Sequence, residues 1–191
     1  KELKAPVNGR YLKAANTVKT VTAGGTFTFE PDDPLAPGGI SLEKDGNSSY
    51  SVNGAIYRIY RDSVADGNAL RISDTVANER FGGSEASDNI VYFMIWNGKG
   101  YFALRHSGSL WNSFRTKYVK QFGSTYAERK VETASGTEYS FYIPINALDV
   151  IEVSNGTYVV KESQPPERYM RNSTEYTASV NGNSVLIEAD D

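Results

Sequence analysis

Apolar and polar positions alternate along most of this chain, and this alternation predicts β-strands. In the segment GTYVVKE at 156–162, Tyr158, Val160 and Glu162 fall on one side, because successive side chains of a strand point to opposite faces. Tyr158 and Val160 are typical core residues, so the pattern predicts a carboxyl group in the core as well. Burying an unpaired carboxylate is costly. Glu162 is therefore a candidate for a chemical role.

Other segments show the same period of two. GISLEKDG and GAIYRIYRD predict two strands near the start of the alternating region, joined by a polar loop. The first strand places Ile40, Leu42 and Lys44 on one face, and the second does so for Ala55, Tyr57 and Ile59. The closing segment SVLIEADD places Val185, Ile187, Ala189 and Asp191 on one face and Leu186, Glu188 and Asp190 on the other.

Other segments predict a hairpin, a short helix and a linker. NIVYFMIW and GYFALRH flank NGKG, in which Asn97 and Gly98 form the dipeptide most typical of a β-hairpin turn. In SLWNSFRTKYVKQFG, aromatic residues recur three or four positions apart before Gly123, which predicts a short amphipathic helix. Three prolines and two glycines in PDDPLAPGG at 31–39 indicate a linker.

Composition narrows the classes of function. With 20 basic and 23 acidic residues the net charge is -3, and no basic run suggests nucleic acid as a partner. Cysteine is absent, which excludes disulfides, thiolate metal sites and cysteine nucleophiles, and His106 is the only histidine. Four aspartates lack the spacing of a calcium loop, namely Asp45, Asp62, Asp66 and Asp74. We expect no metal site and no cofactor.

Two stretches carry a resemblance to a known family. In the first, Lys44 precedes the strand that begins Gly54, Ala55, Ile56. The second is a box formed by Gly156, Tyr158, Glu162, Pro165, Pro166 and Tyr169. Together they resemble the prealbumin-like B-type (CnaB/SpaA-type) domain of Gram-positive collagen adhesins and pilins. The resemblance covers roughly residues 40–62 and 150–191, and Arg168 stands where the family usually has glycine.

The resemblance implies a mainly β fold: a prealbumin-like (Ig-like, transthyretin-type) β-sandwich over residues 40–191. Residues 63–149 then look like a large insertion, which we expect to hold a β-hairpin and a short helix. Residues 1–39 would be an N-terminal strand segment and linker. The chain begins with Lys1 and shows no long apolar run, so we expect a segment of a larger protein that does not insert into membranes.

The resemblance also implies an intramolecular isopeptide bond between Lys44 and an aspartate of the last strand, promoted by Glu162. Desolvation favours the neutral amine that can attack, and it favours a protonated carboxyl group that can shuttle protons. Strand alternation favours Asp191 as the acceptor, whereas a β-bulge would favour Asp190. Taken singly, Lys44 reads more simply as a solvated lysine at a strand end.

The function that the resemblance implies is a structural or adhesive module, a stalk domain or pilin subunit of an extracellular, cell-wall-attached protein of a Gram-positive bacterium. Its partners would be other domains or subunits of a surface fibre. Such a module is not an enzyme, because the isopeptide reaction is a single turnover on the chain itself.

The aromatic residues of the insertion allow two interpretations. Trp96, Tyr101, Trp111, Phe114 and Tyr118 can form a second small hydrophobic core. Exposed Trp and Tyr rings also stack on sugars or grip proteins, so the same residues could form a site for a host glycan or matrix protein. The second interpretation would make the chain a ligand-binding adhesin module.

Overall fold

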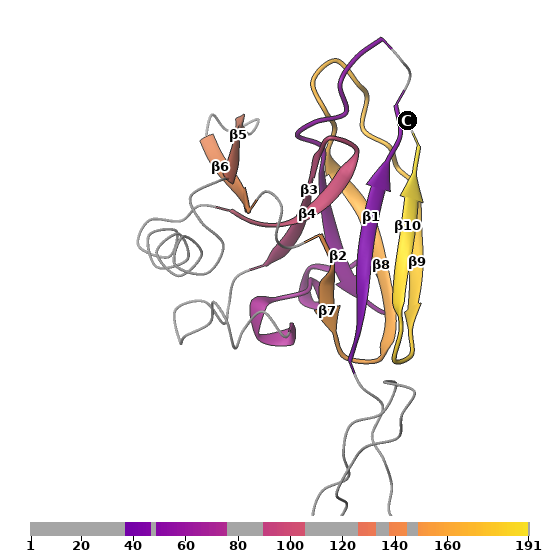
Figure 1. Ribbon diagram of the computed structural model, residues 1–191. Coiled ribbons are helices and arrows are strands. Elements are labelled where there is room, and N and C mark those ends of the chain that lie inside the picture. Colours follow the sequence, from indigo (N-terminus) through magenta and orange to yellow (C-terminus); the bar gives the residue numbers. More distant parts are fainter. Residues whose placement is uncertain are drawn as a thin grey trace, which may run out of the picture.

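The computed structural model describes residues 37–46, 49–75, 90–105, 126–132, 138–144 and 149–190, and this part of the chain is mainly β. Figure 1 shows the strands, which are β1 (Gly38–Lys44), β2 (Ile56–Arg61), β3 (Val91–Trp96), β4 (Lys99–Arg105), β5 (Tyr126–Glu132), β6 (Glu138–Pro144), β7 (Ile151–Val153), β8 (Gly156–Gln164), β9 (Glu175–Val180) and β10 (Ser184–Ala189). Two short 3₁₀ helices follow β2, at Asp66–Asn68 and Ile72–Asp74. The helix predicted at 109–123 lies outside the described residues.

The described strands form one sheet whose main path is β10-β1-β4-β3-β2-β8-β9. The strands β1 and β10 pair in parallel, and the other pairs are antiparallel. Off this path, β7 pairs with β1, and the β5–β6 hairpin joins the sheet through β4. The two ends of the path, β9 and β10, are consecutive in the chain and contact each other, so the sheet curls around on itself (Figure 1).

The β3–β4 hairpin confirms the turn predicted at Asn97 and Gly98. Both residues have positive φ, 50° and 77°, and Trp96 lies opposite Lys99 across the turn. Asparagine and glycine tolerate this left-handed conformation better than other residues. The hairpin lies within residues 63–149, yet its two strands occupy the middle of the sheet between β1 and β2. This part of the predicted insertion is thus integral to the sheet.

The main hydrophobic core lies inside the curl, and the inward faces predicted from strand alternation are the buried ones. Its buried residues include Ile40, Leu42, Ala55, Tyr57, Ile59, Phe93, Phe102, Tyr158, Val160, Ile187 and Ala189. Leu186, on the other face of β10, is 49% exposed. Two charged side chains are buried together with this apolar set: Lys44 and Glu162.

A second hydrophobic cluster covers the opposite face of β2, β3 and β4. It consists of Ile56, Tyr92, Met94, Ala103 and Val131, the last of which belongs to β5. Because β3 packs against apolar side chains on both faces, its first five residues are all buried. Strands covered on both faces have continuous apolar runs, and VYFMIW is such a run.

Candidate functional site

Lys44 is the last residue of β1, and strand alternation directs its side chain into the core. Ile40 and Leu42 precede it on the same face, and all three are at most 1% exposed. Its backbone N–H donates to the carbonyl of Gly98 in the β3–β4 turn, at 2.8 Å, which holds the end of β1 against the hairpin. A lysine so deeply buried is uncommon unless a partner compensates its amine.

The partner is Glu162, on β8. Lys44 Nζ and Glu162 Oε1 lie 3.5 Å apart, and both side chains have an exposed fraction of 0%. Along the path of the sheet, β4, β3 and β2 separate β1 from β8. The contact therefore crosses the interior of the curl and joins its two sides.

Tyr57, on β2, completes the surroundings of the amine. Lys44 Nζ donates a hydrogen bond to the Tyr57 hydroxyl at 3.0 Å and lies 5.6 Å from the centre of its ring. Tyr57 is also the β2 residue opposite Glu162, next to an irregularity in the β2–β8 register. At this irregularity Ser163 Oγ donates to the Ile56 carbonyl at 3.0 Å, so the backbone beside Glu162 is fixed.

The other carboxyl oxygen of Glu162 is held from the loop between β8 and β9. The backbone N–H of Asn172 donates to Glu162 Oε2 at 2.6 Å. The side chain of Asn172 reaches in another direction, and its Nδ2 donates to the Asp190 carbonyl at 2.6 Å. One residue thus contacts both the buried carboxyl group and the end of β10.

Strand β10 brings the end of the described chain beside Lys44. Its parallel register with β1 places Ala189 opposite Lys44, and the Asp45 N–H donates to the Ala189 carbonyl at 3.0 Å. Ala189 is 1% exposed, whereas Asp190 is exposed. The faces alternate as predicted, and Asp191, the favoured acceptor, lies outside the described residues.

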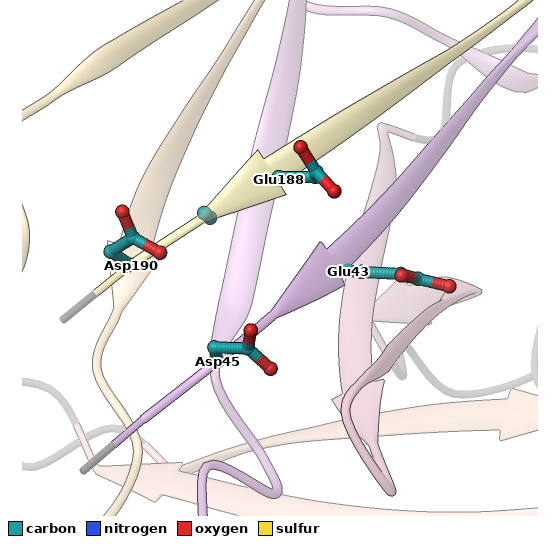
Figure 2. A pocket seen from close by; sticks show the side chains of 5 residues that line it. Glu43, Asp45, Glu188 and Asp190 are labelled. Carbon is teal, nitrogen blue, oxygen red and sulfur yellow. The ribbon is translucent and has the colours of Figure 1, made fainter.

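Asp190, the alternative acceptor, belongs to the outer face. Asp190 lines a pocket of about 370 Å³ together with Glu43, Asp45 and Glu188 (Figure 2). Glu43 and Glu188 are direct neighbours across the β1–β10 pair. The side chain of Asp190 therefore lies on the face opposite to the one that buries Lys44.

The buried pair holds an amine and a carboxyl group close together, so a proton can pass between Lys44 Nζ and Glu162 Oε1. A neutral amine is a nucleophile, and a neutral carboxyl group can donate a proton. The arrangement can therefore support attack of the amine on a carbonyl group brought within its reach.

A third charged group acts on this region from β5. The guanidinium of Arg129 donates to the carbonyl of Gly54, where a positive φ of 83° turns the chain into β2. Burial lowers the pKa of Arg129, while its electrostatic interactions with Glu162 and Glu167 act in the opposite direction. Arg129 thus links the β5–β6 hairpin to the backbone just before Tyr57.

The aromatic candidates for ligand binding divide into two groups. Trp96 and Tyr101 are half-buried and pack against the second hydrophobic cluster. Trp111 and Tyr118, like Phe114, lie outside the described residues. Trp96 and Tyr101 thus contribute to a second core, which was one of the two interpretations of the sequence.

Sequence reasoning missed two residues of the site. Strand alternation places Tyr57 on the inward face of β2, and a buried phenol usually has a hydrogen-bond partner nearby. Asn172 lies in a polar stretch between two strands, where nothing in the sequence distinguishes it from its neighbours. The structure alone shows that its backbone and its side chain face different partners.

Within the described ranges no cluster of three His, Cys, Asp or Glu residues has the arrangement of a metal site, and no helix has the length and apolar character needed to span a membrane. No family model and no curated protein matches the chain. Among solved structures, the chain is similar to the Bacillus anthracis TIE protein, with 9% identity and a TM-score of 0.21 over 85% of this chain. The match spans 36% of that protein, and its TM-score is too low to indicate a shared fold or function.

Proposed function

We propose that this chain is a structural or adhesive module of a bacterial surface protein, a stalk domain or pilin subunit held together by a self-made isopeptide bond. Lys44 supplies the amine, Asp191 the carboxyl group and Glu162 the proton transfer. One observation carries the proposal: Lys44 Nζ and Glu162 Oε1 lie 3.5 Å apart with both side chains fully buried. Lysine and glutamate are almost never fully buried unless they are paired, and buried pairs of ionisable groups are candidates for a functional site.

The reaction balances with groups of the chain alone. The neutral amine of Lys44 attacks the side-chain carbonyl carbon of Asp191, and the new C–N bond forms as the nitrogen loses a proton. Glu162 donates its proton to the departing hydroxyl group and regains one from the nitrogen. One amide and one water result, and Glu162 ends as it began.

The position of the bond suits a module under tension. β1 and β10 are parallel neighbours at one end of the sheet path, and β10 ends beside Lys44. A covalent bond there would pass force between the two strands and shield the residues between them. The proposed bond would close the loop from Lys44 to Asp191. On the loop-entropy model used for disulfides, closing a loop of well over 100 residues would also stabilise the fold by about 5 kcal/mol.

We also propose that the curled sheet is a prealbumin-like sandwich over residues 40–191, enlarged within residues 63–149. Arg168 supports this, because its φ of 73° lies in the left-handed region and its position is one where the CnaB/SpaA-type family usually has glycine. A left-handed backbone at this position is the conformation that the family's usual glycine would favour.

The setting follows from the cross-link. A module of this kind works outside a Gram-positive cell, attached to the wall, with neighbouring domains or fibre subunits as partners and no turnover of a separate substrate. Extracellular domains are often stabilised by disulfides, which this chain cannot form because it has no cysteine. The isopeptide bond would take their place. The alternative of a ligand-binding adhesin module has less support, because Trp96 and Tyr101 pack into the second cluster.

Intact-mass spectrometry of the folded, purified chain tests the proposal. The mass should be lower than the sequence mass by one water, and peptide mapping should join the peptides that contain Lys44 and Asp191. Lys44→Met, Glu162→Ala and Asp191→Ala should each restore the water. A wild-type chain at its full sequence mass would overturn the proposal.

Two matched variants serve as controls. Lys161→Met removes a half-buried lysine of β8 that pairs with Glu175, at 2.8 Å, and lies on the opposite face of the strand from Glu162. Asp190→Ala removes the carboxyl group on the outer face. Both variants should keep the loss of one water, and a full-mass Asp190→Ala chain would transfer the acceptor role to Asp190.

A further inference from the structure

Asn172 lies between β8 and β9 and is half-buried, with its polar groups directed to different partners. Its N–H donates to Glu162 Oε2, and its Nδ2 donates to the Asp190 carbonyl and to the Tyr176 hydroxyl, the latter at 3.2 Å. Its Oδ1 accepts the N–H of Thr174 at 2.8 Å. These contacts connect three separate parts of the fold through one side chain and its own backbone.

We propose that Asn172 is a positioning residue for the cross-linking reaction, which aligns the acid and the acceptor strand with each other. This inference rests on the proposed isopeptide function and assigns a role to a residue that the reaction scheme does not contain.

The backbone N–H of Asn172 orients the carboxyl group of Glu162. A short N–H···O bond at 2.6 Å occupies Oε2 and fixes the orientation of the group. The oxygen that accepts this bond is the poorer place for a proton, so in the acid form that the proposed reaction requires, the proton belongs on Oε1. Oε1 is the oxygen that lies 3.5 Å from Lys44 Nζ. The backbone of Asn172 thereby directs the proton toward the reacting amine.

The side chain of Asn172 holds the residue that follows β10. Asn172 Nδ2 donates to the carbonyl of Asp190, the last residue that the structure describes, and so holds the end of the described strand segment that leads to the proposed acceptor. The preceding carbonyl, of Ala189, accepts from the Asp45 N–H on the β1 side. The carbonyls of Ala189 and Asp190 are thus held from β1 and from the loop after β8.

The orientation of the Asn172 amide is set by its hydrogen-bond partners. An asparagine can be turned over, which exchanges its oxygen and nitrogen. Here the oxygen faces an N–H donor, Thr174, and the nitrogen faces a carbonyl acceptor, Asp190. Only one orientation satisfies both partners, so the donor to the acceptor strand is set by the turn at Thr174.

The test follows the rate of cross-linking in the whole chain. The chain is made by cell-free translation, synthesis is stopped, and samples quenched over time are weighed as intact masses to give the fraction lighter by one water. Asn172→Ala should slow this conversion roughly five- to tenfold, the effect of losing one hydrogen bond to the acceptor strand. Asn172→Asp should also slow it near neutral pH, because a carboxylate accepts from Thr174 but donates nothing to Asp190.

A pH series distinguishes positioning from general stability. Below about pH 4 the new carboxyl group of Asn172→Asp gains a proton and can donate to Asp190 again. The ratio of its rate to the wild-type rate should therefore rise as the pH falls. Asn183→Ala is the matched control, since Asn183 Oδ1 accepts the Asn181 N–H in the turn before β10, as Asn172 does for Thr174.

Thermal unfolding in a Lys44→Met background gives the stability lost by each variant without any cross-link. Rates that fall for both Asn172 variants but not for Asn183→Ala, at equal loss of stability, support the role. Wild-type rates for the Asn172 variants, or rates that follow stability alike at both asparagines, overturn it. If the wild-type chain itself stays at full mass, the proposed function fails, and the inference fails with it.

Discussion

Lys44 Nζ lies 3.5 Å from Glu162 Oε1, across the interior of a curled sheet, with both side chains entirely removed from solvent. The phenol of Tyr57 and the N–H of Asn172 hold the amine and the carboxyl group from either side. Each group has thus lost water and gained directed partners, which is how proteins prepare acids and nucleophiles for reaction.

The energetic interdependence of this pair can be measured without the cross-link. Glu162→Met leaves the Lys44 amine buried without its carboxyl partner, whereas the double variant Lys44→Met with Glu162→Met replaces the pair by apolar side chains of similar length. On the proposed mechanism neither chain forms the cross-link. We expect the single variant to be less stable than the double by about 3 kcal/mol or more in urea unfolding. Equal stabilities would mean that the amine escapes to water when Glu162 is absent.

Strand alternation predicted the burial of Lys44 and Glu162, because both side chains continue the inward faces of apolar strands. It also predicted the outward position of Asp190. The meeting of the two groups could not follow from alternation, since they come from strands that four pairings separate along the sheet path. That contact depends on the curl, which depends on how all the strands pack.

The sequence did not predict where the β3–β4 hairpin lies in the sheet. The β3–β4 hairpin was recognised from Asn97 and Gly98, but its place between β1 and β2 was not. A turn dipeptide specifies a local backbone conformation, and it carries no information on which strands flank the hairpin. Apolar residues on both faces of VYFMIW were the available signal that β3 lies deep in the sheet.

Tyr92 makes the stability of the fold sensitive to alkaline pH. Burial raises the pKa of Tyr92 above its ordinary value of 10.0, an effect that the charges of Arg58 and Arg105 partly oppose. The unfolded chain releases this proton near pH 10 while the folded chain retains it. The stability is therefore fully present below pH 10 and is lost as the pH rises through the folded pKa.

Tyr92→Phe has no proton to lose and should resist this loss. Between pH 10 and the folded pKa, the advantage of the variant over the wild type should grow by about 1.4 kcal/mol per pH unit. Urea unfolding at pH 7 supplies the baseline cost of removing the hydroxyl group. A difference that stays constant from pH 7 to pH 11 would contradict the prediction.

The acidic row on the outer face should weaken the pairing of β1 with β10. Glu43 and Glu188 are direct cross-strand neighbours, and Asp45 and Asp190 extend the row (Figure 2). Like charges in such positions repel. Glu188→Lys should stabilise the fold by a few tenths of a kcal/mol at low ionic strength, and salt should remove the gain.

The matched control for this charge reversal is Glu152→Lys. Glu152 is also exposed and also lies on a strand paired with β1, but its neighbour across the pair is Gly39. Thermal unfolding at low and high salt should show a salt-dependent gain for Glu188→Lys alone. The same gain at Glu152 would mean that net charge, and not the Glu43–Glu188 pair, is responsible.

Arg168 has a φ of 73°, a conformation that is strained for residues with a Cβ atom. Its guanidinium lies 5.4 Å from the ring centre of Tyr50, an exposed contact that offsets part of the strain. Arg168→Gly should therefore change the unfolding free energy by less than about 1 kcal/mol, because relief of strain opposes the greater freedom of the unfolded chain.

The adjacent Glu167→Gly is the comparison that isolates the strain. Glu167 is exposed and has no positive φ, so glycine there adds freedom to the unfolded chain and relieves nothing. Arg168→Gly should accordingly be more stable than Glu167→Gly by about 1 kcal/mol in thermal or urea unfolding, since the entropic cost of glycine is common to both. The reverse order would show that the contact with Tyr50 outweighs the strain, and that arginine at this position stabilises the loop.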